Sequence, residues 1–147
     1  MKHILTIILA MLLAAAAAYG QSDESGKMQG KMSHGGTMMM SSGGKVDFMG
    51  LDDARMLAAK GPTVLFFHAD WCPSCRADMK QIDARLSELG DITLVVVNYD
   101  RSADLKKRYG VTYQHTYVQI DGDGKKIALW SGGGVDGILK NVVRGGM

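Results

Sequence analysis

The sequence has few of the features that define several common protein classes. Its 147 residues are too few for a two-domain enzyme with separate cofactor and substrate modules. Two cysteines can form only one bridge, which excludes a small scaffold held by several disulfides. A formal net charge of +2 gives no basis for nucleic-acid binding. Apolar residues make up 46% and charged residues 22%, so we expect an ordinary globular domain rather than a wholly disordered chain.

The longest apolar run lies near the amino terminus, and it is short. It covers 15 residues, Ile4–Ala18, whereas a membrane-spanning helix needs roughly 20. A basic start precedes it, and the small residues of Ala18-Tyr19-Gly20 offer a cleavage site, as is typical of a secretory signal peptide. We therefore expect residues 1–20 to be removed and the protein to be periplasmic or secreted, where disulfide chemistry is possible. An uncleaved segment would instead serve as a membrane anchor.

Residues 21–45 contain no aromatic and no branched aliphatic side chain, which predicts a flexible linker before a domain of residues 46–147. The linker is rich in methionine and carries one histidine: Met28, Met32, His34, Met38, Met39 and Met40. Thioether and imidazole groups suit Cu(I). Capture of copper is therefore one interpretation of this segment, and a plain tether is the other.

Strand and helix patterns alternate along the domain. Strands are expected at 46–48, 63–68, 92–97, 116–120 and 126–130, and helices at 51–60, 75–89, 102–109 and 135–143. The first half contains a strand–helix–strand crossover, which implies parallel strands. The turn at 121–124 joins the last two strands as an antiparallel hairpin. The prediction is an α/β fold with a mixed central sheet and helices on both faces.

The motif Trp71-Cys72-Pro73-Ser74-Cys75 follows a buried strand and opens an amphipathic helix, which indicates a redox-active pair. Cys72 falls at the helix N-cap, where the helix dipole favours a thiolate. Cys75 lies one turn later on the buried face. We therefore predict that Cys72 is the exposed attacking thiol and that Cys75 resolves the mixed disulfide. An inert structural disulfide and half of a zinc site are the alternatives.

From about residue 46 to residue 145 the chain resembles the thioredoxin family. The residues that carry this resemblance are PTVLFFHADWCPSC, ITLVVVNYD, Tyr109-Gly110-Val111 and the final strand–strand–helix unit. The resemblance implies the thioredoxin fold and thiol–disulfide exchange with other proteins, and it calls for no cofactor. The dipeptide between the cysteines is Pro-Ser instead of the Gly-Pro of typical thioredoxins. This difference leaves the direction of electron flow open.

His115 occupies the position at which family members usually have a cis-proline. The Gln114–His115 bond is therefore expected to be trans, or cis under strain. The resemblance implies that His115 faces the two sulfur atoms, where it would stabilise the Cys72 thiolate, shuttle protons or become a third metal ligand. An ordinary loop residue bonded to solvent is the alternative. Proline at this position is expected to leave the fold as stable as before, or slightly more so.

Other positions also bear on the predicted site. Phe66 and Val96 stand where typical thioredoxins carry a buried aspartate and a lysine, so water or His115 would have to serve Cys75 as proton carrier. The resemblance places a substrate groove around the motif. Its expected residues are Asp70, Trp71, Pro73, Ser74, Tyr113, Gln114 and Thr116.

These observations predict a periplasmic thiol–disulfide oxidoreductase that exchanges disulfides with partner proteins and is recharged by an unidentified electron donor. Reduction of partners is favoured over oxidation, because the chain has no room for the inserted substrate domain that disulfide oxidases of the superfamily usually carry. The alternative is a copper-binding or copper-delivery protein. It would use Cys72, Cys75 and His115 as a soft-metal site supplied by the methionine-rich linker.

Overall fold

The computed structural model describes residues 43–145. The expected signal peptide and nearly all of the linker, including its methionines and His34, lie outside these residues, so those expectations stay predictions. Within residues 43–145, no helix combines the length and the apolar character needed to cross a membrane.

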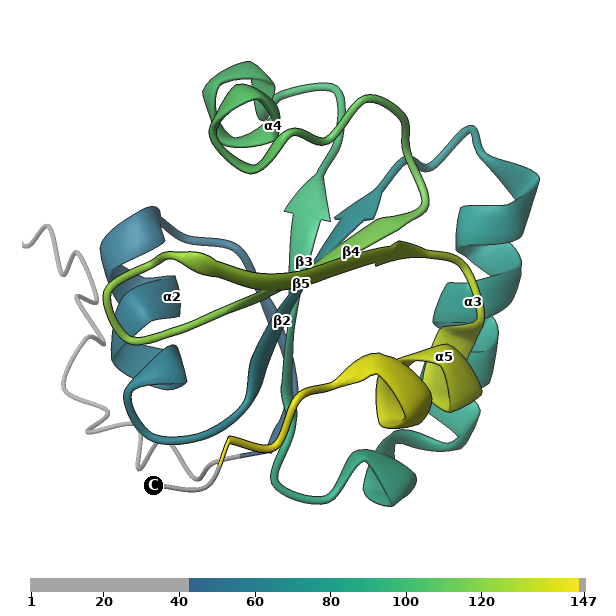
Figure 1. Ribbon diagram of the computed structural model, residues 1–147. Helices are drawn as coiled ribbons and strands as arrows, with labels where there is room; N and C mark the ends of the chain where they lie inside the picture. Colours follow the sequence, from purple (N-terminus) through teal and green to yellow (C-terminus); the bar gives the residue numbers. More distant parts are fainter. Residues whose placement is uncertain (1–42, 146–147) are drawn as a thin grey trace, which may run out of the picture. The chain divides into compact units, whose positions relative to one another are not determined.

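Five strands form one mixed sheet (Figure 1). They are β1 (Gly44–Asp47), β2 (Thr63–His68), β3 (Thr93–Asn98), β4 (Thr116–Ile120) and β5 (Lys126–Ser131), in the spatial order β1-β3-β2-β4-β5. The strands β1, β3 and β2 are parallel, while β4 runs antiparallel to both β2 and β5. This topology confirms the predicted mixed sheet and places β2 at its centre.

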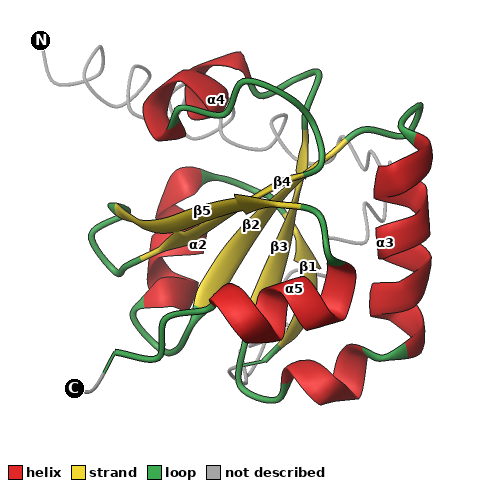
Figure 2. Cartoon of the chain, turned by 45° about the vertical axis from the view of Figure 1, so that its right-hand side comes forward, coloured by secondary structure: helices red, strands yellow, loops and turns green. Residues whose placement is uncertain are grey.

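Helices cover both faces of the sheet (Figure 2). They are α2 (Leu51–Ala58), α3 (Pro73–Ala84), α4 (Ala103–Tyr109) and α5 (Gly134–Asn141). Alternate residues of β2 point to opposite faces, so Val64 and Phe66 pack with Ile82 of α3, and Leu65 and Phe67 pack on the other face. Leu57 of α2 and Tyr109 of α4 complete that second core. The continuous apolar strand β2 is therefore buried on both faces, as expected of a central strand covered by helices on both sides.

The expected helix over residues 75–89 is wrong at its end. The helix α3 stops at Ala84, and Leu86–Leu89 forms a separate 3-10 turn, η1. The break lies at Arg85, whose backbone leaves the helical region and whose guanidinium binds Glu88 at 2.7 Å and Asp136 at 2.8 Å. The apolar spacing hid this break, because Leu86 and Leu89 still pack on the same core.

The last helix also ends early, at Asn141 rather than at residue 143. Val142 adopts an extended conformation, and the main chain of Val143 pairs with the side chain of Gln119 in β4. The Gln119 amide donates to the Val143 carbonyl at 2.9 Å and accepts from the Val143 N–H at 2.8 Å. Gln119 is only 2% exposed, so this pairing satisfies an amide buried within the sheet.

Candidate active site

The two cysteines lie where β2 gives way to α3. Cys72 is the N-cap of α3, and its sulfur accepts the backbone N–H of Cys75 at 3.4 Å. Pro73 occupies the first helical position, where its missing N–H costs no hydrogen bond. Both cysteines are free thiols in this structure. The predicted N-cap placement of Cys72 is confirmed.

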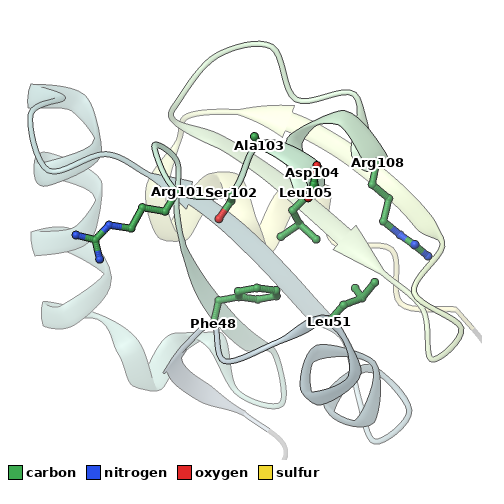
Figure 3. Close-up of a pocket in the computed structure, with 8 residues that line it drawn as sticks. All are labelled: Phe48, Leu51, Arg101, Ser102, Ala103, Asp104, Leu105 and Arg108. Atoms are coloured by element: carbon green, nitrogen blue, oxygen red, sulfur yellow. The ribbon is translucent and has the colours of Figure 1, made fainter.

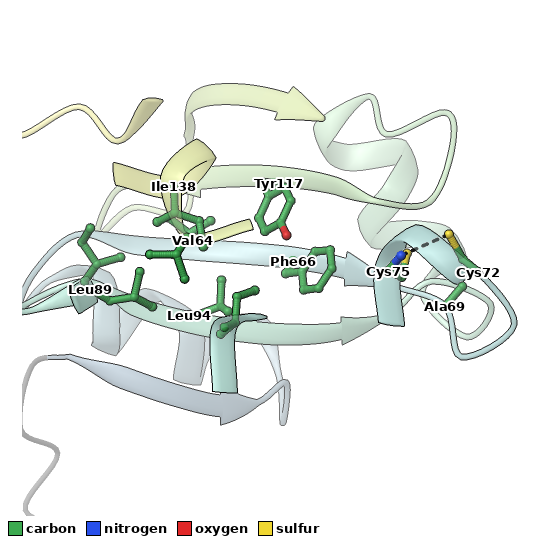
Figure 4. Packing of buried hydrophobic residues seen from close by; sticks show 12 residues of the cluster. Val64, Phe66, Ala69, Cys72, Cys75, Leu89, Leu94, Tyr117 and Ile138 are labelled. Carbon is green, nitrogen blue, oxygen red and sulfur yellow. Dashed lines mark hydrogen bonds between the residues drawn. The ribbon is translucent and has the colours of Figure 1, made fainter. Parts of the chain in front are cut away.

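The prediction that Cys72 is exposed is wrong. Cys72 is 4% exposed and Cys75 is fully buried, and both belong to the core cluster on the α3 side of the sheet (Figure 4). The main chain of Cys72 turns back toward Ala69, whose carbonyl accepts the Cys72 N–H at 3.1 Å. Its chain neighbours Trp71 and Pro73 are exposed. The exposed residues of the motif therefore surround a sulfur that is itself covered.

The surroundings shift the pKa values of the two thiols in opposite directions. Burial by itself raises the pKa of Cys72, but hydrogen bonds from the Cys75 backbone, the Cys75 thiol and the Gln114 side chain outweigh it and lower the pKa. Burial raises the pKa of Cys75 to about 11. The negative charge of the reduced pair therefore belongs on Cys72, while Cys75 keeps its proton.

His115 precedes β4 with a backbone φ of 65°, in the left-handed region. Residues 43–145 contain no cis peptide bond, so the Gln114–His115 bond is trans. The His115 N–H donates to the Phe67 carbonyl at 2.9 Å, and its own carbonyl accepts from Gly132 at 3.0 Å. A left-handed residue with a paired N–H thus occupies the position expected of a proline.

The imidazole of His115 binds a carboxylate instead of the sulfur atoms. Its Nε2 lies 2.6 Å from Oδ2 of Asp78, and only the His115 backbone acts on the Cys75 thiol. The stabilisation of the Cys72 thiolate by the imidazole therefore stays a prediction, since the hydrogen bond of the imidazole goes to Asp78. The predicted soft-metal site of Cys72, Cys75 and His115 is wrong, because no group of three or more His, Cys, Asp or Glu side chains within residues 43–145 could hold a metal ion.

Asp78 was not among the predicted site residues. Its Oδ2 accepts three hydrogen bonds: from His115, from the Tyr117 hydroxyl at 2.8 Å and from the Gly134 N–H at 2.9 Å. Asp78 follows Cys75 by three residues on α3, and this spacing places both on one face of the helix. A carboxylate on an otherwise apolar face was the signal that could have revealed it.

An aromatic stack lies beside this carboxylate. Phe66 and Tyr117 are parallel with their ring centroids 4.3 Å apart, and Trp130 stacks on the far side of Tyr117 at 5.6 Å. Phe66 is fully buried, so apolar packing fills the space below the cysteines on β2. The polar groups of this region come instead from α3, β4 and the start of α5.

The expected groove residues differ in their exposure. Trp71 is 57% exposed and its Nε1 donates to Asp100 at 3.0 Å, while Pro73, Ser74, Asp70 and Tyr113 are also exposed. Gln114 is half-buried, and its side chain is among the groups that lower the pKa of Cys72. The assignment of Thr116 to the groove is wrong, because its side chain is buried and its hydroxyl donates to the Tyr113 carbonyl at 2.9 Å.

A cavity of about 500 Å³ lies elsewhere, between the segment that leads into α2 and the start of α4 (Figure 3). Its lining residues are Phe48, Leu51, Arg101, Ser102, Ala103, Asp104, Leu105 and Arg108. None of them belongs to the cysteine motif. This cavity is therefore separate from the cysteine motif.

Comparison with known proteins gives consistent matches. The Thioredoxin family model matches residues 52–143. Thioredoxin-T of Drosophila melanogaster is 33% identical over 61% of this chain and 57% of its own length. A thioredoxin of Rhodospirillum rubrum is 33% identical over 38% of this chain and 55% of its own. The chain thus spans a little over half the length of each of these two relatives.

Solved structures agree with the fold. The X-ray structure of Fasciola hepatica thioredoxin is 26% identical, with a TM-score of 0.54, and the match covers 65% of this chain and 92% of that one. The crystal structure of thioredoxin from Trypanosoma brucei brucei is 20% identical, with a TM-score of 0.57, over 70% of this chain and 90% of that one.

The opposite pKa shifts of the two thiols predict selective alkylation. Iodoacetamide should label Cys72 first, with an apparent pKa below the free value of about 8.5. Cys75 should react only as the pH approaches its pKa of about 11. Labelling rates between pH 5 and 11, located by peptide mass spectrometry, measure both values. Faster labelling of Cys75 than of Cys72 at neutral pH would reverse the assignment of charge.

The structure revises the expectation that proline fits at position 115. Proline holds φ near −65° and has no N–H, whereas His115 has a φ of 65° and donates to Phe67. We expect His115→Pro to lower the free energy of unfolding by at least about 2 kcal/mol. His115→Gly, which keeps the N–H and permits the left-handed backbone, is the matched control and should lose less. Urea denaturation measures both, and a proline variant as stable as the wild type would contradict this loop geometry.

Proposed function

The chain belongs to the thioredoxin family, and we propose that it is a thiol–disulfide oxidoreductase that acts on other proteins. The observation that carries this proposal is the asymmetric dithiol at the start of α3. Cys72 accepts hydrogen bonds that lower its pKa, and Cys75 is buried beside it with a raised pKa. One thiol is thus ready to attack, and the other holds its proton until it is needed.

The exchange proceeds in two steps that follow from this geometry. The Cys72 thiolate attacks one sulfur of the partner's disulfide, so that a mixed disulfide forms and the partner's other sulfur leaves as a thiolate. Cys75 then loses its proton and attacks the Cys72 sulfur. The bond between Cys72 and the partner breaks, the partner leaves fully reduced, and Cys72 and Cys75 share a new disulfide.

Reduction of partners is the direction we propose, with a separate electron donor that restores the dithiol. Short connections join the elements of residues 43–145, and no substrate domain is inserted among them. The reduction potential of the pair against glutathione decides the direction. A value near about −270 mV is expected of a reductase, and a value near about −120 mV would make the protein an oxidant.

We also propose that the protein acts in the periplasm or outside the cell. The support is the sequence of residues 1–20, with its basic start and short apolar run. A reporter that is active only after export, fused after residue 45, should gain activity from residues 1–45. Replacing Leu9 and Leu12 with arginine should abolish that activity, and an unchanged signal would contradict export.

The two-step exchange predicts different effects for the two cysteines. Reduced wild-type protein should reduce insulin, and Cys72→Ser should abolish the reaction because the attacking sulfur is gone. Cys75→Ser should stop after the first step and accumulate mixed disulfides with partners, which non-reducing gels detect. If Cys72→Ser retained insulin reduction, or if Cys75→Ser trapped nothing, the assigned roles would be wrong.

A further inference from the structure

The cavity between the segment that leads into α2 and the start of α4 has an apolar floor. Phe48 and Leu51 form one side of this floor, and Leu105 of α4 forms the other (Figure 3). All three side chains are half-buried and pack against the second core cluster, so part of each stays open to solvent. An open apolar cleft covers only part of a free small molecule, whereas it can receive a single side chain that a larger molecule presents.

Positive charge surrounds this apolar floor. Arg101 and Arg108 lie at opposite ends of the cavity, and their guanidinium groups extend outward from it (Figure 3). Residues 100–108 contain four basic and two acidic side chains, so this short segment carries as much net positive charge as the whole chain. None of the four basic side chains forms an ion pair with another residue of the described part of the chain. Charges in this position attract acidic groups and orient a partner as it approaches.

The cavity lies at the same edge of the sheet as the two thiols. The segments after β1 and β3 line it, the cysteine motif follows β2, and these three parallel strands are adjacent in the order β1-β3-β2. The Trp71 indole donates to Asp100 at 3.0 Å, and the next residue is Arg101 of the cavity. An interface of ordinary size, about 800 Å² on each partner, that is centred on Cys72 would extend over this edge.

We propose that this cavity is a docking site for the partner protein, and that it receives a large apolar side chain flanked on both sides by acidic residues. The apolar side chain fills the space above the floor, and the flanking carboxylates pair with Arg101 and Arg108. Asp104 supplies the one carboxylate of the lining, so a basic flank meets two cations against it. The site selects partners and speeds their encounter, and it takes no part in the exchange chemistry. This inference rests on the proposed exchange reaction.

The test compares synthetic peptides that differ only in a segment beside their disulfide. Each peptide carries one intramolecular disulfide, a flexible spacer and a phenylalanine that is flanked on each side by two glutamates or by two lysines. A third peptide keeps the glutamates and has glycine in place of the phenylalanine. The rate of each peptide with reduced protein is divided by its rate with 2-mercaptoethanol, so that the intrinsic reactivity of each disulfide cancels.

Charge and apolar contact should each contribute to the rate. At low salt we expect the glutamate peptide to react about tenfold faster than the lysine peptide, because Arg101 and Arg108 steer it. This difference should nearly vanish at 1 M NaCl, where charges are screened beyond about 3 Å. The glycine peptide should react about fivefold more slowly than its phenylalanine counterpart at both salt concentrations, because it leaves the apolar floor unfilled.

A charge-matched pair of variants locates the effect. Arg101→Glu together with Arg108→Glu should reverse the ratio of the glutamate-peptide rate to the lysine-peptide rate. Lys60→Glu together with Lys140→Glu changes the net charge equally at exposed positions outside the cavity, and it should keep the wild-type ratio. Because each variant is judged by a ratio, a general loss of activity does not affect the comparison. If the lysine pair shifted the ratio as much as the arginine pair, only overall charge would matter and the proposal would be overturned.

The wild type decides alone if the arginine variant does not fold. Equal rates for the glutamate and lysine peptides overturn the docking site, whether the cavity is unused or is covered by a second copy of the chain or by residues 21–42. A charge preference without any loss for the glycine peptide also overturns it, because the apolar floor would then be unused. A small neutral disulfide, 2-hydroxyethyl disulfide, separates the two kinds of failure. Wild type that reduces this reagent but shows no peptide preference refutes only the docking site, whereas wild type that reduces neither the reagent nor any peptide refutes the exchange reaction itself.

Discussion

The short contact between the Cys72 sulfur and the Cys75 N–H is the interaction on which the site depends. It caps α3, and the same bond places partial positive charge against the one sulfur that can use it. A serine or aspartate N-cap would begin α3 equally well, but it would supply no thiolate nucleophile. One side chain therefore serves both local folding and reactivity, because the group that caps α3 is also the attacking sulfur.

Burial gives the site its second constraint. Because β2 lies at the centre of the sheet, Cys75, one turn into α3, lies inside the core. Burial raises the pKa of this thiol and keeps it neutral. The same core is filled by the stack of Phe66, Tyr117 and Trp130, which leaves little room for polar groups on β2. The polar group of this region is therefore Asp78 of α3, beside the stack. Residues from three different segments donate hydrogen bonds to its Oδ2.

The regular parts of this arrangement could be predicted from the sequence, because apolar runs, turn residues and helical spacings indicate which segments are buried. Strands β2, β4 and β5, the N-cap at Cys72 and the mixed sheet were all expected on those grounds. The break at Arg85 was not, because an ion pair with Asp136, 51 residues away, is a tertiary contact that no local spacing encodes. The left-handed backbone of His115 and the three hydrogen bonds to Asp78 were not predicted, for the same reason. His115 was expected to face the sulfur atoms, but its imidazole binds Asp78, which spacing alone did not mark as a partner.

The pairing between Gln119 and the main chain of Val143 limits how far the domain can be shortened on its carboxyl-terminal side. A truncation that removed Val143 would leave the buried side-chain amide of Gln119 without a hydrogen-bond partner for its N–H or its oxygen. Each unpaired group would lower the free energy of unfolding by about 1–3 kcal/mol. Arg144 extends this attachment through its contact with Asp91 at 2.8 Å. The segment after α5 therefore satisfies buried polar groups of the core. A tag or partner fused on the carboxyl-terminal side should begin after Gly145.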